Sequence, residues 1–362
     1  MADNRRYEIE VWWRGQTFVG EIGRLCRNIN YSMTRNGVYT LDFSIDSTAY
    51  REWCESINED PMNVLMVKNA DIKLKRNGEY VLGAFVADYP DPQFNQDNSV
   101  INIACDGYLN LLADQLIDPV RYNQWDGTAI AWDLINKKNQ RPNSTLGITL
   151  GTVFNTGKKR DREYADYQEV KESIINLTSL GDGQNDWDFE IDAMRRFNTY
   201  DKLGSYRPEI ALEYPAPRKG IGVLSMGYLI SGEMANRVIL KGSGQGVDTL
   251  LSIREDNDSQ IKYGVHEATL MFSDISIQNT LDEHAESELR ARKDPAILPQ
   301  PVVSGAQFDL DTIKLGDVIT MNNQGDPLFA IRGEYRIEQI DVRLDENMAE
   351  TIKLTLSTHG DS

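Results

Sequence analysis

The stretch that decides the fold is residues 71–89, DIKLKRNGEYVLGAFVADY. Its centre, Asn77-Gly78, separates two runs rich in apolar and β-branched residues. Asn-Gly is the strongest short-range hairpin signal, because both residues tolerate the positive φ of a type I′ turn. The stretch therefore predicts two antiparallel strands joined by a tight turn.

The same texture extends through the first hundred residues. Strands 7–13 and 17–22 flank the turn Arg14-Gly15-Gln16, and a second hairpin over 30–45 turns at Asn36-Gly37. Residues 47–57 place Tyr50, Cys54 and Ile57 at helical spacing, which predicts one short packing helix. Strand 100–104 then completes a β-rich block.

An internal echo links the two ends of the chain. Residues 78–82, GEYVL, lead to the strand pattern of 100–104, and residues 333–337, GEYRI, lead to that of 351–355. The echo predicts two β blocks built on a similar plan. Chance similarity of two hairpins is the open alternative.

The middle of the chain has helical periodicity. Ile130 and Leu134 form an apolar stripe, and a second helix is expected from Asp166, with Glu169 in a capping box, to Gly181. A strand follows at 187–191. The sequence predicts an α+β, mainly β protein in which two barrel-like tube domains, 1–112 and 201–362, flank an inserted small α/β domain, 113–200.

The last segment carries one expected helix, at about 280–293. Thr280 and Glu283 fit a capping box, and Leu281, Ala285 and Leu289 form its buried stripe. Residues 295–301, which contain three prolines, are expected to be an extended linker. The expected strands are 237–241, 260–263, 269–272, 318–321, 335–344 and 351–357.

Composition narrows the class of function. The 362 residues carry a formal net charge of −18, which argues against wrapping nucleic acid, because phosphate binding needs clustered Lys and Arg. The charge has two explanations, solubility or a surface that repels a polyanion. There is no C-x-x-C pair among the three cysteines, and no apolar run is long enough to span a membrane.

A glycine-rich loop is the first candidate site. Residues 236–247, NRVILKGSGQGV, begin like a dinucleotide fingerprint at Gly242 and Gly244, but position 247 is Val. No Lys-Ser or Lys-Thr follows, so a P-loop is also excluded. The stretch is interpreted as a turn between two strands.

Catalytic and metal motifs are absent from the sequence. His266, His284 and His359 belong to no metal motif, and His284 is expected to face solvent. Alternation places Asp186, Asp188 and Glu190 on one strand face, interpreted as solvated. We therefore assign no catalytic, cofactor-binding or metal-binding residue, and expect a protein that is not an enzyme and needs no cofactor.

The order of the motifs resembles that of the baseplate-hub, or minor tail, proteins of long-tailed bacteriophages. The resemblance rests on several stretches in series. These are 34–44, 71–89, 130–136, 146–151, 162–164, 174–180, 187–190, 235–238 with Gly242-Ser-Gly244, Tyr263-Gly264, the Ala285 helix, and 333–337. It covers most of the chain.

The resemblance implies a homotrimeric ring that joins the sixfold tail tube to the threefold tip and encloses the DNA passage. The implied partners are further copies of the chain, the distal tail or tube proteins, and tip or fibre proteins, while genomic DNA passes without specific binding. The implied location is the virion tail tip, after assembly in the host cytoplasm. We expect the α/β unit outside the ring, a mostly acidic channel, and any lytic or fibre activity in another protein.

Two alternatives remain open at this point. One is a carbohydrate-binding or carbohydrate-active β-protein that uses Trp12, Trp13 and Trp125 as a sugar platform. The other is a hub component of a contractile injection apparatus, which is implied to share the hub fold.

Overall fold

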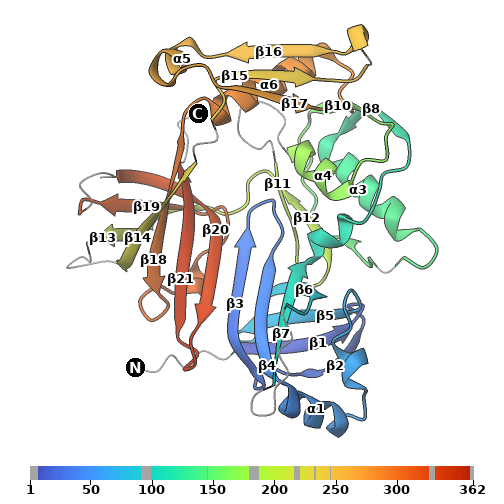
Figure 1. Cartoon of the computed structure of the whole chain (residues 1–362), viewed down its shortest axis with the longest axis vertical. Coiled ribbons are helices and arrows are strands. Elements are labelled where there is room, and N and C mark those ends of the chain that lie inside the picture. The colour runs from blue at the N-terminus through green and yellow to red at the C-terminus, as the bar shows by residue number, and fades with distance from the viewer. Residues whose placement is uncertain are drawn as a thin grey trace.

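The computed structural model describes residues 7–90, 99–144, 146–178, 187–215, 221–231, 234–244, 246–325 and 331–358. The protein is mainly β, and its helices gather in two smaller α/β parts (Figure 1). A 13-stranded sheet runs through both ends of the chain in the order β19-β13-β14-β18-β21-β20-β3-β4-β7-β6-β5-β1-β2. This confirms the predicted fold class.

The first β block is a bent sheet of seven strands. Asn77 and Gly78 have φ of 53° and 83°, and the strands on either side of them pair antiparallel, so the predicted hairpin is confirmed. The hairpins at residues 14–16 and 36–37 are confirmed as well. The elements are β1 (Tyr7–Trp13), β2 (Thr17–Glu21), β3 (Cys26–Thr34), β4 (Thr40–Asp46), α1 (Ser47–Ser56), α2 (Pro61–Val64), β5 (Ala70–Arg76), β6 (Glu79–Asp88) and β7 (Val100–Gly107).

The second β block is a closed barrel of six strands. It closes because β19 pairs with both β13 and β20. Residues 295–301 were expected to be a linker, but most of them belong to the barrel strand β18, which is a correction. The elements are β13 (Tyr206–Tyr214), β14 (Ile221–Ser231), β18 (Ala296–Ser304), η3 (Leu310–Thr312), β19 (Val318–Asn323), β20 (Ile331–Leu344) and β21 (Glu350–Thr358).

A single ladder fuses the two blocks. Strand β20 pairs with β3 from Gln339↔Thr34 to Arg343↔Asn30, so the sheet continues from one block into the other. One hydrophobic core serves both blocks, and it contains Ile9, Leu41 and Leu74 from the first block and Ile319, Ile340 and Leu354 from the second. The blocks are therefore held side by side by packing as well as by backbone hydrogen bonds.

The α/β unit has a separate core around α3 (Gly127–Asn139) and α4 (Val170–Thr178). Asp126 caps α3 by accepting from the Thr128 amide. Helix α4 starts at Val170 and not at Asp166, and its expected end at Gly181 lies outside the described residues. The other elements are η1 (Tyr108–Leu112), β8 (Val120–Asp126), β9 (Thr149–Leu150), β10 (Lys159–Tyr164), β11 (Asp188–Ile191) and β12 (Arg196–Tyr200).

A second small α/β unit is inserted between β14 and β18. Its core contains Val238, Leu240, Leu281, Ala285 and Leu289. The sequence pattern did not separate this unit from the second β block. Its elements are β15 (Arg237–Lys241), η2 (Gly246–Asp248), β16 (Leu251–Glu255), α5 (Asn257–Tyr263), β17 (Glu267–Met271) and α6 (Gln278–Arg292).

Two local predictions in this unit are wrong. Residues 260–263 were expected to be a strand, but they belong to α5, which Asp256 caps by accepting from the Ser259 amide. Helix α6 begins at Gln278 after Ile277, which offers no side-chain cap, so Thr280 is not the N-cap. The buried stripe of Leu281, Ala285 and Leu289 is confirmed.

Candidate functional site

The glycine-rich loop is a hairpin, as predicted. Strands β15 and β16, on either side of it, pair antiparallel from Arg237↔Glu255 to Lys241↔Leu251. Gly244 has φ of 112°, and a Cβ there would lie 2.3 Å from the Asp248 carbonyl oxygen. The loop needs this glycine for backbone geometry, which accounts for its composition without a bound phosphate.

Two polar residues that were expected to face solvent are buried. His284 is 2% exposed, and its ring lies 5.0 Å from that of Phe272. Asp188 is 0% exposed, so only part of its strand face is solvated. Within the described residues, no group of three or more His, Cys, Asp or Glu side chains is placed to hold a metal ion, and no helix is long and apolar enough to cross a membrane.

The three tryptophans of the carbohydrate alternative do not form one platform. Trp12 and Trp13 are neighbours on β1, so their side chains point to opposite faces of the sheet. Trp12 packs with Phe18 at 5.3 Å between ring centroids, whereas Trp125 lies on β8 of the α/β unit against Tyr122. The structure gives no support to a sugar site made of these residues.

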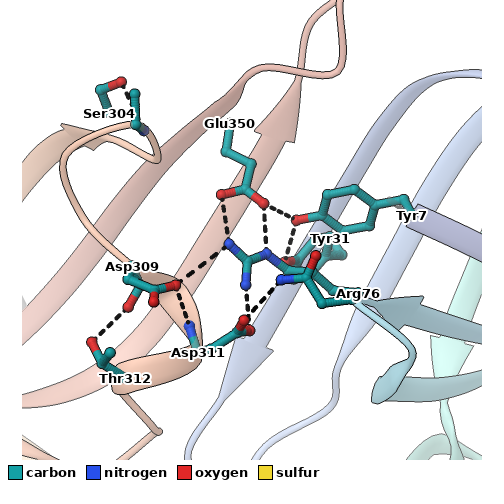
Figure 2. Close-up of polar contacts among 10 residues, drawn as sticks. Tyr7, Tyr31, Arg76, Ser304, Asp309, Asp311, Thr312 and Glu350 are labelled. Atoms are coloured by element: carbon teal, nitrogen blue, oxygen red, sulfur yellow. Dashed lines mark hydrogen bonds and ion pairs between the residues drawn. The ribbon is translucent and has the colours of Figure 1, made fainter. Parts of the chain in front are cut away.

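Buried arginines join the units, and Arg76 joins the two β blocks (Figure 2). Its side chain, 1% exposed, donates from Nε to Glu350 Oε1 at 2.6 Å and from Nη2 to Oε2 at 3.1 Å. Arg76 ends β5 of the first block, and Glu350 starts β21 of the second. Such a bidentate pair fixes the orientation of both side chains as well as their distance.

Two tyrosines and a loop of the second block complete this cluster. The Tyr7 hydroxyl donates to Glu350 Oε1 at 2.6 Å and lies 3.2 Å from the Tyr31 hydroxyl. Burial, with the neighbouring Tyr31 and Glu350, raises the pKa of Tyr7, so its hydroxyl stays protonated and can donate. Asp311 accepts from Arg76 and also from Asn77 Nδ2 at 2.9 Å, which ties the Asn77-Gly78 turn to the second block.

Arg35 joins three units at one point. From the β3–β4 turn it donates from Nε to Glu338 Oε2 of β20 at 2.8 Å, and from Nη1 to Asp188 Oδ1 of β11 at 2.6 Å. Asp188 also accepts from Asn36 Nδ2 at 2.8 Å and from the Leu203 amide at 2.7 Å. These contacts satisfy the buried carboxylate and hold the α/β unit against the line where the blocks meet.

Two further arginines hold the smaller units. Arg195 donates to both carboxylate oxygens of Asp71, at 3.0 and 2.6 Å, and thereby ties the α/β unit to the first block. Arg162, on β10, lies 3.4 Å from Asp274 and 3.5 Å from His284 Nε2, and so joins the α/β unit to the 234–294 unit. Burial, followed by the charges of Arg162 and Arg160, lowers the pKa of His284 to about 3. The imidazole is therefore neutral at pH 7.

The fusion of the blocks creates one continuous polar surface, here called the shared face. It consists of the outward side chains of five adjacent strands, β21, β20, β3, β4 and β7, which stand side by side in Figure 1. Gln339 Nε2 donates to Ser32 Oγ at 3.0 Å across the β20–β3 junction. Its members are Thr351, Lys353, Thr355, Gln339, Asp341, Arg343, Asn30, Ser32, Thr34, Thr40, Asp42, Asn102, Ala104 and Asp106.

Most side chains of the shared face are small and neutral. Its carboxylates are Asp42, Asp106 and Asp341, and its cations are Arg343 and Lys353. Partial burial, and then the charge of Asp106, raise the pKa of Asp42. The face thus combines hydroxyls and amides with a few charges of both signs, and it presents no cluster of cations.

Comparison with solved structures identifies the fold. The tail protein from Neisseria meningitidis MC58 superposes with a TM-score of 0.68 at 12% identity, over 98% of this chain and 97% of that one. The 43 kDa tail protein of prophage MuSo2 from Shewanella oneidensis gives 0.61 at 14%, over 97% and 98%. The E. coli c3393 protein, a component of the type VI secretion system, gives 0.52 at 11%, over 93% of this chain and 74% of that one.

No protein-family model and no curated protein sequence matches the chain. The likeness to the tail proteins nevertheless spans nearly the whole of both partners, including the two β blocks and both inserted units. The fold of this chain is therefore that of the phage tail and baseplate hub proteins.

Proposed function

We propose that the chain is a structural tail-tip, or baseplate-hub, protein of a phage-type tail, and that three copies form a ring around a DNA passage. The observation that carries this proposal is the fusion of two β blocks side by side through β20 and β3 over one core. A subunit with two such blocks supplies six blocks per trimer. A trimer can therefore meet a sixfold tube on one side and a threefold tip on the other.

The shared face is the proposed wall of the passage. It is the surface to which both blocks contribute without interruption, and a ring wall requires such continuity. Duplex DNA binds proteins mainly through clustered Lys and Arg. On this face Arg343 and Lys353 stand among carboxylates and neutral groups, so DNA is expected to pass without specific binding.

This proposal revises the expected channel chemistry. The sequence led us to expect a lining made predominantly of Asp and Glu. On the shared face, hydroxyl and amide side chains outnumber the carboxylates, so most of the net charge of −18 belongs to other surfaces. The proposed lining is weakly gripping because it lacks clustered cations, with only a modest contribution from repulsion.

The proposed partners are further copies of the chain, the distal tail or tube proteins, and the tip or fibre proteins. The proposed role is non-enzymatic, at the tail tip of a virion assembled in the host cytoplasm, with the α/β unit outside the ring. A hub in a contractile injection apparatus is the second candidate, and the likeness to the type VI secretion component favours it.

Electron cryomicroscopy of assembled tails tests the proposal. Three copies at the tip, with the shared face toward the axis and α3 and α4 outside, is the expected result. Six copies or one copy, or a lumen lined by the α/β unit, would contradict it. Assignment of the particle as a phage tail or an injection apparatus separates the two candidates.

A further inference from the structure

Strand β14 presents an unusual edge of the sheet. Its eleven residues, IGVLSMGYLIS, contain no charged residue and no proline, although 26% of the chain is charged. Leu224, Leu229 and Ile230 are 60%, 49% and 54% exposed. Apolar side chains with such exposure on one strand mark a surface that another molecule covers.

The backbone of this strand is also open on one side. Strand β13 pairs with β14 only at Ile221 and Gly222, whereas β18 pairs along the other side as far as Ser231. In the described part of the chain, no strand is paired with the outer side of Ser225–Gly227, Leu229 or Ile230. A register shift near Leu224 leaves the ladder from Ser225 onward regular.

The opposite edge of the same two-stranded ribbon shows what protection looks like. Strand β18 pairs with β21 only from Val302 to Ser304, so its residues 296–301 also form an edge. That edge carries Pro299 and Pro301, which cannot donate a backbone hydrogen bond to another strand. Proteins use proline and charge to stop edges from pairing, and β14 has neither.

A complementary edge lies at the other end of the shared face. Strand β6 pairs with β7 only from Ala104 to Gly107, which leaves Val100–Ile103 without a second partner strand among the described residues. The two open edges therefore flank the same five-stranded surface. Two different surfaces at opposite ends of one subunit make a head-to-tail contact, and such contacts close into rings.

We propose that the β14 edge of one copy of this chain pairs with the β7 edge of the next copy. The pairing satisfies backbone groups of both edges and covers Leu224, Leu229 and Ile230. It also continues the shared face from subunit to subunit, which would make the passage wall one closed sheet. The inference rests on the proposed ring, but it names the surface that builds it.

The test compares oligomeric state among variants of the full chain by mass photometry and sedimentation. Leu224→Lys with Leu229→Lys places two charges on the edge, and Leu224→Thr with Leu229→Thr removes the apolar surface while keeping strand propensity. Met62→Lys, at a 79% exposed apolar position on α2, is the matched control. Circular dichroism and thermal melting show that each variant folds.

The expected result is a trimer for the wild type and for Met62→Lys, a monomer for the lysine pair, and a weakened trimer for the threonine pair. Trimers that survive both pairs would overturn the edge inference and leave the proposed ring intact. A wild-type chain that forms no trimer, and that occurs in tails in a number other than three, would instead overturn the proposed function.

A cross-link covers the case of a chain that becomes trimeric only within the tail. Leu229→Cys with Asn102→Cys places one thiol on each edge, while the three native cysteines are buried. A short bis-maleimide should join neighbouring copies in assembled tails up to a closed trimer, and each single-cysteine variant should give no product. Three copies in the tail without cross-linking by the double variant would overturn the edge inference alone.

Discussion

Arg76 and Glu350 form an ion pair that water does not reach, since their side chains are 1% and 0% exposed. Removing one partner of a buried pair leaves the other charge uncompensated, which costs about 3–5 kcal/mol. We therefore expect Arg76→Met to lower the free energy of unfolding by about 3–5 kcal/mol, measured by urea denaturation. Because the pair spans the two blocks, the loss should affect the whole shared core.

Lys68→Met is the matched control for that measurement. It removes an ion pair with Asp114 in which the two side chains are 60% and 63% exposed. Exposed pairs contribute about 0–1 kcal/mol, so this change should be nearly silent. Equal losses in the two variants would show that the Arg76 cluster is not what holds the blocks together.

His284 gives the protein a pH dependence that can be measured. The pKa of an unfolded histidine is near 6.5, and burial lowers that of His284 to about 3. Between these values the unfolded state binds a proton that the folded state does not, so stability falls as the pH falls from 6.5 toward 3. The slope from this residue is at most about 1.4 kcal/mol per pH unit.

The variant His284→Gln keeps a hydrogen-bonding group beside Arg162 but does not titrate. We expect the difference in unfolding free energy between the wild type and this variant to shrink or reverse between pH 6.5 and pH 5. Few carboxylates protonate in that range. His266→Gln, at an exposed histidine, should leave the slope unchanged. Identical slopes for all three proteins would contradict the assignment of His284 as buried and neutral.

Residue-scale contacts of this kind could not be predicted from the sequence. Arg76 and Glu350 are separated by 274 positions, and Arg35 is 303 positions from Glu338. No local pattern records such pairings. Asp188 was predicted to be solvated because strand alternation was correct, but alternation cannot show that Arg35 and Asn36 cover that face.

At the scale of elements, two glycines have the same backbone conformation in different surroundings. Gly78, in the β5–β6 turn, has φ of 83° and no atom within 4 Å of the place of a Cβ. Gly204, which precedes β13, has φ of 84°, but a Cβ there would lie 2.2 Å from the Asp317 amide nitrogen. Gly78→Ala should cost only the left-handed conformation, about 1 kcal/mol.

Gly204→Ala should cost roughly 3 kcal/mol or more, because the collision with a neighbouring backbone adds to the same conformational penalty. Urea denaturation of the two variants measures the difference directly. Each serves as the control for the other, since both change glycine to alanine at positive φ. Equal losses would mean that the connection between β12 and the barrel is not packed as described.

The elements that could be predicted are those with local chemistry. The turn at Asn77-Gly78 and the stripe of Leu281, Ala285 and Leu289 depend on neighbours in the sequence, and both are confirmed. Residues 260–263 were wrong because the cap that starts α5, Asp256, lies outside the alternating run. Strand β18 was missed because its prolines indicate a linker, whereas they stand on an open edge of the ribbon.

For the whole molecule, the sequence echo indicated two β blocks but not how they are arranged. The β20–β3 ladder joins residues about 300 positions apart, and the shared core follows from it. The unit at 234–294 was hidden because its strands have the same texture as those of the barrel that carries it. Insertion of one unit between two paired strands leaves no local signal.

The shared face leads to a prediction about DNA. If it lines the passage, the wild-type protein should not bind duplex DNA measurably at about 0.15 M salt. Asp42→Lys with Asp341→Lys would bring two added cations near Arg343 and Lys353 on adjoining strands. Each phosphate that the new cluster contacts releases counterions, so binding should appear at low salt and weaken steeply as salt increases.

The matched control reverses the same number of charges elsewhere. Glu52 and Glu55 are exposed on α1, away from the shared face, so Glu52→Lys with Glu55→Lys gives the chain the same net charge. Fluorescence anisotropy with a short duplex, from 0.05 to 0.2 M salt, compares the variants over a range in which phosphate contacts lose much of their affinity. Net charge alone would make the two pairs bind alike. In assembled tails the Asp42 and Asp341 pair should slow genome ejection while the α1 pair leaves it unchanged, because only the first pair would meet the DNA. Equal ejection rates would remove the shared face from the passage.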